Sequence, residues 1–260
     1  MKKKILFSIT NLIGGGAEKI LLDTVKAMDK TKYDVYVFSL LNEGIYLEEI
    51  KKYATYFFAF DLEAYPERLR NYIRFLFLRY IKFSKKEKLY KKYVQGEYDY
   101  EIAFLEGPVT KIIAGSKSRT PKYAWVHVDL INLPDSNKYY RSKEEAKECY
   151  NFYNKILCVS SDVKTSFLKI YDVDEEKVQV QLNVLDTNKI LNSIKNVTEY
   201  KRQNPLNLIT VGRLSPQKGY DRLLKCCVRL KEDKLTFKLK IVGTGLLKDT
   251  YQKFIDDNEL

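Results

Sequence analysis

The sequence predicts an α/β protein built from parallel sheets with crossover helices. Three observations support this fold class. Short apolar runs alternate with helical patterns along most of the 260 residues. The first apolar run is followed by three consecutive glycines, Gly14 to Gly16, and a helical pattern begins directly after them. A polar, weakly patterned stretch then precedes a second series of the same alternation.

These observations also predict the domain organisation. We expect a first domain over residues 1–185, an interdomain linker over 186–205 and the start of a second domain over 206–260. The second domain looks unfinished, because a usual domain has roughly 100–150 residues.

Each element follows from a local pattern. Strands are expected where short apolar runs occur, and helices where apolar residues recur at helical spacing. In the first domain the expected strands are 4–9, 34–40, 55–60, 100–105, 123–128, 155–160 and 178–182. Its expected helices are 17–28, 45–53, 66–93, a charged helix between 128 and 155, and 162–171. In the second domain we expect strands 206–211 and 238–242, a helix over 221–230 and another from 247.

Composition narrows the class of protein. A hydrophobic content of 45% with 31% charge is that of an ordinary globular protein. The net charge of +12 indicates an anionic partner: phosphates, nucleic acid or an anionic membrane surface. One histidine and four cysteines without a C-x-x-C pair exclude a Cys/His zinc site and favour a reducing cytosol.

The sequence also bears on membrane insertion. The basic and apolar N-terminus runs into the glycine turn without a cleavage site, so we interpret it as a strand rather than a signal peptide. The sequence contains no uncharged run of about 18 apolar residues, so it does not predict a membrane span. We expect a cytoplasmic protein that is soluble or lies on a surface.

The glycine turn, GGGAEK, is typical of a loop that approaches a ligand closely. Gly14 to Gly16 permit positive φ angles and close backbone approach. A helix that begins directly after them offers a positive N-terminus to an anion. Glu18 falls in its first turn, where a carboxylate is favoured, so a plain turn capped by Glu18 is an equally good interpretation. The spacing is not G-x-G-x-x-G, so the dinucleotide fingerprint is absent.

A second motif, VGRLSPQKGYDRLL, covers residues 211–224. Arg213 and Lys218 lie five residues apart across a turn at the end of an expected strand. A planar guanidinium and a mobile ammonium together suit a diphosphate at the carboxyl end of a parallel strand. The alternative is a pair of solvated surface cations.

The whole string GRLSPQKGYDRLL closely resembles the nucleotide-sugar-binding segment of family 4 glycosyltransferases with the GT-B fold. GGGAEKILLD, WVHVD, ILCVSSDVKTSFLKIY, KVQVQLNVLD and LKIVGTGLLKDTYQKFI match further segments of that family in the usual order. The resemblance covers nearly the whole chain, and residues 211–224 are its most specific part. It implies a GT-B-like protein: a Rossmann-like, acceptor-side N-terminal domain and the start of a Rossmann-like, nucleotide-sugar-binding C-terminal domain.

The resemblance also implies an activity. It is the transfer of a sugar, with retention, from a UDP- or GDP-linked donor to a lipid-linked or glycan acceptor in surface polysaccharide biosynthesis. No other cofactor and no metal are expected. Family members carry an E-x7-E glutamate pair further on, and this chain ends before that region. A truncated, inactive fragment that binds membrane or acceptor, or needs a partner chain, is therefore the alternative.

Several residues take roles by this resemblance. Arg213 and Lys218 would contact the donor diphosphate, with Gly15 and Gly16 beside it in the loop that lines the cleft between the domains. Retention needs stabilisation of the leaving diphosphate more than a protein nucleophile, which is electrostatic work. His127 matches a histidine near the reacting sugar and is our candidate catalytic residue, although a lone histidine beside apolar residues is often structural.

Three carboxylates are assigned to the acceptor side. Asp129 follows His127 and could orient the acceptor. Glu106 ends another strand, where α/β folds place ligands, or is a solvated loop charge. Glu18 of the glycine turn completes this group.

A third feature is the basic stretch 66–93, with ten basic and two acidic residues among aromatic and aliphatic ones. It is typical of an amphipathic helix on an anionic membrane surface, where each cation contributes on the order of 1 kcal/mol. We assign Arg74, Phe77, Arg79 and Lys82 to that surface, on the inner face of the cell membrane. A core-packing helix with a solvated basic face is the alternative. A nucleic-acid partner is not expected, because no nucleic-acid motif accompanies the charge.

Overall fold

The computed structural model describes residues 1–132, 134–194 and 205–260, and divides into two compact units, Met1–Thr187 and Asn188–Leu260. Each unit is an α/β structure with a parallel sheet, so the predicted fold class is confirmed. Residues 195–204 of the expected linker lie outside the described residues. The expected linker also includes a helix, α8 (Thr187–Ile194), that the sequence pattern did not reveal.

Unit 1 contains a seven-stranded sheet in the order β3-β2-β1-β4-β5-β6-β7, and every pair of neighbours is parallel. The strands are β1 (Lys3–Ile9), β2 (Tyr33–Leu41), β3 (Thr55–Phe60), β4 (Tyr100–Ala103), β5 (Lys122–Val126), β6 (Lys155–Cys158) and β7 (Val178–Val180). The direction of strand addition reverses between β1 and β4. Parallel α/β sheets bind ligands outside the carboxyl ends of strands at such a reversal.

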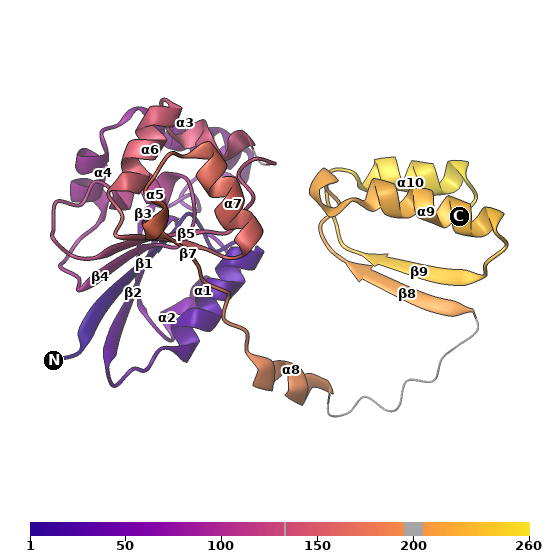
Figure 1. Cartoon of the computed structure of the whole chain (residues 1–260), viewed down its shortest axis with the longest axis horizontal. Helices are drawn as coiled ribbons and strands as arrows, with labels where there is room; N and C mark the ends of the chain where they lie inside the picture. Colours follow the sequence, from indigo (N-terminus) through magenta and orange to yellow (C-terminus); the bar gives the residue numbers. More distant parts are fainter. Residues whose placement is uncertain (133, 195–204) are drawn as a thin grey trace. The chain divides into compact units, whose positions relative to one another are not determined.

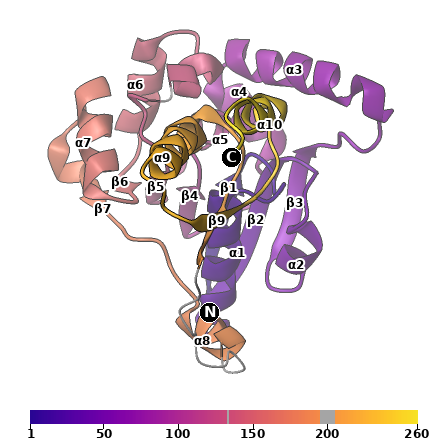
Figure 2. The same ribbon diagram turned by 90° about the vertical axis from the view of Figure 1, so that its right-hand side faces the viewer.

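Helices cover both faces of this sheet, as Figures 1 and 2 show. One face carries α1 (Gly16–Ala27) and α2 (Leu47–Lys51). The other carries α3 (Glu67–Phe83), α4 (Lys86–Tyr93), α5 (Pro108–Ile113), α6 (Lys143–Asn151) and α7 (Ser161–Ile170). Two 3₁₀ helices, η1 (Pro134–Tyr139) and η2 (Glu175–Lys177), complete the unit. The strands are apolar on both faces because both faces are covered.

The basic stretch 66–93 forms two helices rather than one. Ser84 and Lys85 are both extended, with ψ angles of 150° and 137°, so α3 ends there and α4 starts anew. The sequence also gave no prediction of α5, a short helix that begins with Pro108 after Gly107 at φ 100°. Proline suits a first helical position because its missing N–H has no partner there.

Unit 2 is a parallel pair of strands, β8 (Leu206–Val211) and β9 (Phe237–Val242). The helices α9 (Tyr220–Glu232) and α10 (Lys248–Asp257) lie together on one side of these strands (Figure 1). Its small core gathers Leu214, Tyr220, Leu224 and Tyr251. A 3₁₀ turn, η3 (Pro216–Lys218), separates β8 from α9.

Within the described residues, no helix combines the length and apolar character that crossing a bilayer requires.

Candidate functional site

The glycine turn has a specific conformation at each residue. Gly14 has a φ of 112°, which favours glycine. A Cβ on Gly15, the N-cap of α1, would lie 2.3 Å from Oε2 of Glu18, so the Glu18 carboxylate is folded back over this residue. A Cβ on Gly16 would meet nothing within 4 Å. The anion nearest the N-terminus of α1 is therefore Glu18 itself, and a donor phosphate there would meet a carboxylate.

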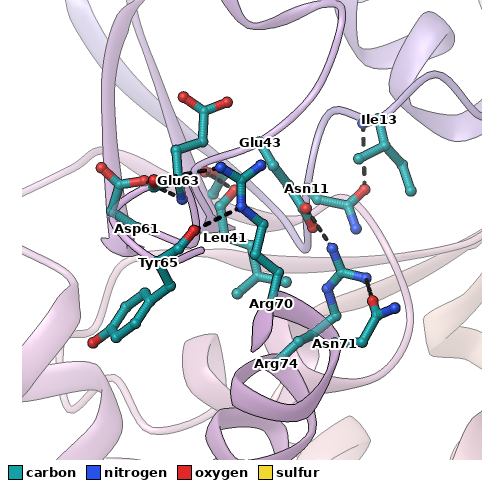
Figure 3. Close-up of polar contacts among 11 residues, drawn as sticks. Asn11, Ile13, Leu41, Glu43, Asp61, Glu63, Tyr65, Arg70, Asn71 and Arg74 are labelled. Atoms are coloured by element: carbon teal, nitrogen blue, oxygen red, sulfur yellow. Dashed lines mark hydrogen bonds and ion pairs between the residues drawn. The ribbon is translucent and has the colours of Figure 1, made fainter. Parts of the chain in front are cut away.

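The segment that leads into the glycine turn is held by the loop after β2. Gly44, at φ 130°, has no room for a side chain, because a Cβ would lie 1.9 Å from the Leu12 carbonyl carbon. The Leu12 N–H donates to the Glu43 carbonyl at 3.0 Å. The Glu43 carboxylate in turn pairs with Arg74 of α3 at 2.5 Å, with Asn71 of the same helix beside it (Figure 3). The turn is thus linked to α3 through backbone contacts and one ion pair.

Glu106 and His127 follow the carboxyl ends of the neighbouring strands β4 and β5. The His127 backbone N–H donates to Glu106 Oε2 at 3.0 Å. Burial raises the pKa of Glu106, and the nearby Glu18 carboxylate raises it further. Glu18, Glu106 and His127 are therefore brought together at the reversal between β1 and β4. The sequence predicted Glu106 and His127 at the ends of strands and Glu18 in the first turn of a helix.

His127 is set in an aromatic environment. Its ring lies 5.0 Å from the Phe104 ring and 5.9 Å from Trp125, centroid to centroid. Burial lowers the pKa of His127 to about 4, opposed by a hydrogen bond to the Phe104 backbone. The ring is therefore neutral at pH 7. Its Nε2 is buried and has no partner among the described residues, nor has the Trp125 Nε1.

Asp129 has a local structural role. It accepts hydrogen bonds from Ser166 of α7, from the Ile131 N–H at 3.0 Å and from the Asn132 side chain. These bonds, that from Ser166 foremost, lower the pKa of Asp129. Both carboxylate oxygens are already engaged, so an acceptor role for Asp129 stays a prediction that would require their rearrangement. No pattern in the sequence indicated Ser166, which lies 37 residues further along the chain.

The predicted membrane-surface residues divide between core and surface. The prediction that Phe77 faces a membrane is wrong: Phe77 is 8% exposed and stacks on Phe60 with ring centroids 4.4 Å apart. Arg74 is half-buried in its pair with Glu43. Arg79 is exposed and Lys82 half-buried. The helix is confirmed, but of the four residues assigned to the surface Phe77 packs on Phe60 of β3.

In unit 2 the loop between β8 and α9 carries Arg213 and Lys218. Both side chains are exposed, and within the described ranges neither forms an ion pair or a hydrogen bond. The loop backbone is held against the loop after β9: Leu214 N–H donates to Thr244 O at 2.8 Å, and Gly212 N–H to Val242 O at 3.0 Å. Held by these hydrogen bonds, the loop presents two cations that are unpaired within the described residues at the carboxyl end of β8.

Glycines make this packing possible. A Cβ on Gly243 would lie 1.9 Å from the Gly212 carbonyl oxygen, and one on Gly245 would lie 2.3 Å from that of Leu214. Gly219, at φ 66°, ends η3 and begins α9. In the part of the chain that the structure describes, no group of His, Cys, Asp and Glu side chains is placed to hold a metal ion.

Comparison with solved structures supports the GT-B fold. The chain aligns over 98% of its length with the lipopolysaccharide outer core galactosyltransferase WaaB, at 18% identity and a TM-score of 0.60. It aligns over 99% with Anabaena Alr3699/HepE in complex with UDP and glucose, at 17% identity and a TM-score of 0.66. A mutant of S. aureus TarM in complex with fondaparinux, alpha-GlcNAc-glycerol and UDP aligns over 99%, at 13% identity and a TM-score of 0.64. At these identities the likeness concerns the fold.

The chain spans 65%, 67% and 76% of the lengths of those three proteins. No curated protein matches it significantly. The family model described as Glycosyltransferase Family 4 matches residues 14–189, and the model described as Glycosyl transferases group 1 matches residues 192–260. The chain belongs to the group 1 glycosyltransferases: its N-terminal domain matches the family 4 model and residues 192–260 match the group 1 model.

Proposed function

We propose that this chain transfers a sugar, with retention, from a UDP- or GDP-linked donor to a glycan or lipid-linked acceptor in surface polysaccharide biosynthesis. The observation that carries the proposal is the pair of exposed cations Arg213 and Lys218, unpaired within the described residues, on the hydrogen-bonded loop of unit 2. They lie in the segment matched by the group 1 model. A structural neighbour, HepE, binds UDP and glucose, which supports a nucleotide-sugar donor.

Each cation has a chemical task in this proposal. When the bond from sugar to diphosphate breaks, negative charge accumulates on the departing phosphate while the sugar becomes oxocarbenium-like. A guanidinium and an ammonium already positioned for that charge stabilise it without reorganisation. Because neither Arg213 nor Lys218 is paired to a carboxylate within the described residues, nothing must be displaced when the diphosphate arrives.

Unit 1 contributes groups suited to hydroxyls. Neutral His127 holds its Nδ1–H toward the Phe104 carbonyl, and its Nε2 lone pair has no partner among the described residues. Because Nε2 is buried, a neighbouring side chain must move before a sugar hydroxyl can donate to it. Glu106, whose pKa burial raises, and Glu18 offer carboxyl groups at the same edge of the sheet. We assign them to acceptor hydroxyls.

Turnover tests this function. The protein is incubated with UDP-glucose or GDP-mannose and a membrane-lipid extract of its source cells, and released UDP or GDP is measured. Release that depends on the extract, and that falls more than tenfold in His127→Ala with UDP affinity unchanged, supports the proposal. If UDP binds but no sugar leaves either donor, the inactive binding protein becomes the better account. If neither nucleotide binds, the donor assignment is overturned.

A peripheral membrane position is a second part of the proposal, carried by the outer face of α3, defined by Leu69, Tyr72 and Leu76. These apolar side chains are 42%, 62% and 44% exposed. Arg68 and Arg79 lie on the same exposed side, so an anionic bilayer matches both the charge and the apolar surface.

Vesicle sedimentation tests this position. Vesicles with anionic phosphatidylglycerol should sediment the protein, and 0.5 M salt should release it, since a Debye length of about 4 Å screens such charges. Tyr72→Ser with Leu76→Ser should reduce sedimentation. Equal sedimentation by neutral phosphatidylcholine would contradict the electrostatic part.

A further inference from the structure

A groove of about 550 Å³ lies between α3 and η1 in unit 1. We call it the α3–η1 groove. Its chemically distinctive lining consists of Phe75, Arg79, Lys82, Phe83, Lys138 and Tyr139. The first four come from one side of α3, adjacent to the outer face, and the last two end η1.

The cations of the groove differ in how far their charge is compensated. Arg74, at one end, is neutralised by Glu43 at 2.5 Å (Figure 3). Arg79 and Lys82 have no carboxylate within ion-pair distance among the described residues; they lie over the Phe83 ring, 5.2 Å and 5.9 Å from its centroid. A cation over a ring keeps its N–H donors available. The groove therefore offers uncompensated donors to an anion.

Two aromatic rings of the groove are unusually open to solvent. Phe75 is 59% exposed and Phe83 is 56% exposed. Large apolar side chains that gather at one place on a surface typically mark a binding site. The apolar face of a sugar ring packs on such a ring, while its charged substituent reaches the neighbouring cations.

The groove is held in place and adjoins the site already described. The buried Lys111 ammonium donates to the Lys82 carbonyl at 2.6 Å, which fixes the end of α3. On the other wall, the Tyr139 ring lies against Gly107, where a Cβ would be 2.9 Å from its Cδ2. Gly107 directly follows Glu106. Tyr139 of the groove therefore lies against the residue that follows Glu106.

We propose that the α3–η1 groove binds an anionic group, a phosphate or a carboxylate, of a glycan acceptor, with a sugar ring packed on Phe75 and Phe83. The proposal rests on the proposed function in calling that glycan an acceptor. Binding itself requires no donor and no turnover, so the two can be tested apart.

The test uses glucose 1-phosphate as the probe, with glucose and inorganic phosphate as comparison ligands. Binding is followed by backbone amide shifts in the NMR spectrum of the whole protein. We expect saturable shifts at residues of α3 and η1, with glucose 1-phosphate binding roughly fivefold more tightly than inorganic phosphate because of the added ring contact. Glucose alone should bind more weakly than either anion.

Matched variants distinguish binding in the groove from non-specific attraction of the anion to a positively charged surface. Arg79→Glu and Lys82→Glu should each weaken glucose 1-phosphate binding about tenfold. Arg68→Glu makes the same charge change on an exposed residue of the same helix outside the groove, and should change affinity less than twofold. Phe83→Leu should remove the preference for glucose 1-phosphate over inorganic phosphate while leaving phosphate binding in place.

Three results would overturn the proposal. They are shifts confined to other elements, equal loss in Arg68→Glu and Arg79→Glu, or equal affinity for inorganic phosphate and glucose 1-phosphate. Loss of anionic-vesicle binding in the groove variants without any sugar-phosphate shifts would assign the groove to membrane lipid instead. UDP titration of the same samples keeps the proposed function separate, because groove variants should bind UDP as the unmodified protein does.

Discussion

The two units differ in how completely they bury their sheets. Unit 1 has seven strands with helices on both faces, and the last five residues of β1 and of β2 are all buried. Unit 2 has two strands with helices on one side, and large apolar side chains stay open: Ile209 is 68% exposed, Val211 76% and Leu246 99%. Apolar burial is the main stabilising contribution in folding. Unit 1 therefore gains more stability per residue from its core than unit 2, which leaves much of its apolar surface unburied.

The same contrast extends to the candidate site residues. In unit 1 they include Glu106 and His127, whose pKa values are shifted by burial. In unit 2 they are exposed, permanently charged cations. Substitutions in unit 1 should therefore affect stability and function together, whereas those at Arg213 and Lys218 should affect function alone.

The largest effect should come from the core of unit 1. Phe77→Ala removes a ring stacked at 4.4 Å on Phe60 and should lower the free energy of unfolding by about 3–5 kcal/mol. The single tryptophan, Trp125, is in unit 1, so its fluorescence during urea unfolding reports on that unit. Phe75→Ala on the same helix and Ile209→Ala in unit 2 are the controls, with changes under about 0.5 kcal/mol. An equal loss of unfolding free energy in Phe77→Ala and Phe75→Ala would contradict the packing of Phe77 on Phe60.

The next effect concerns pH. An unfolded histidine has a pKa near 6.5, and burial lowers that of His127 to about 4. Between these values the unfolded chain binds the proton and the folded one does not, so this contribution is complete above pH 6.5 and is lost as the pH falls toward 4. Glu106, with its raised pKa, acts in the opposite sense.

Comparison of the unmodified protein with the His127→Gln variant isolates the contribution of this histidine to the pH dependence of stability. Urea unfolding at pH 7, 5.5 and 4 should show the unmodified protein losing up to about 3 kcal/mol more than the variant over this range. If the free energy of unfolding changes with pH in the same way in both proteins, His127 is not buried as a neutral ring.

A smaller effect should separate two glycines of one turn. Gly14→Ala introduces a Cβ at φ 112° and 2.9 Å from Ile45 Cδ1, and should cost about 1–2 kcal/mol. Gly16→Ala meets nothing within 4 Å at the start of α1 and should be neutral or stabilising by about 0.5 kcal/mol. Thermal unfolding of the two variants measures the difference. An equal loss in both would contradict the conformation of the turn.

Much of this molecule could be predicted from the sequence, because alternating apolar patterns report parallel strands and crossover helices directly. The positions of Glu106 and His127 follow from strand ends, and that of Glu18 from the helix after the glycine turn. Other features depend on contacts that no local pattern records. Phe77 and Phe75 are both aromatic residues of one amphipathic helix, and only packing on Phe60 distinguishes the buried ring from the exposed one.

Long-range polar contacts were also invisible in the sequence. Ser166 engages Asp129 across 37 positions, and Glu43 engages Arg74 across 31. In each case a residue that looked available for a ligand or a membrane was already paired. The unpaired state of Arg213 and Lys218 likewise could not be read from spacing, although the spacing did predict where they lie.

The most direct test of the donor assignment compares UDP with uridine by titration calorimetry. The account predicts that the protein binds UDP at least tenfold more tightly than uridine, because only UDP offers a diphosphate to the two cations. Arg213→Ala and Lys218→Ala should abolish that difference without changing the unfolding of either unit, and Lys225→Ala, an exposed cation on α9, should preserve it. Equal binding of UDP and uridine by the unmodified protein, or an unchanged preference in both variants, would contradict the diphosphate role of Arg213 and Lys218.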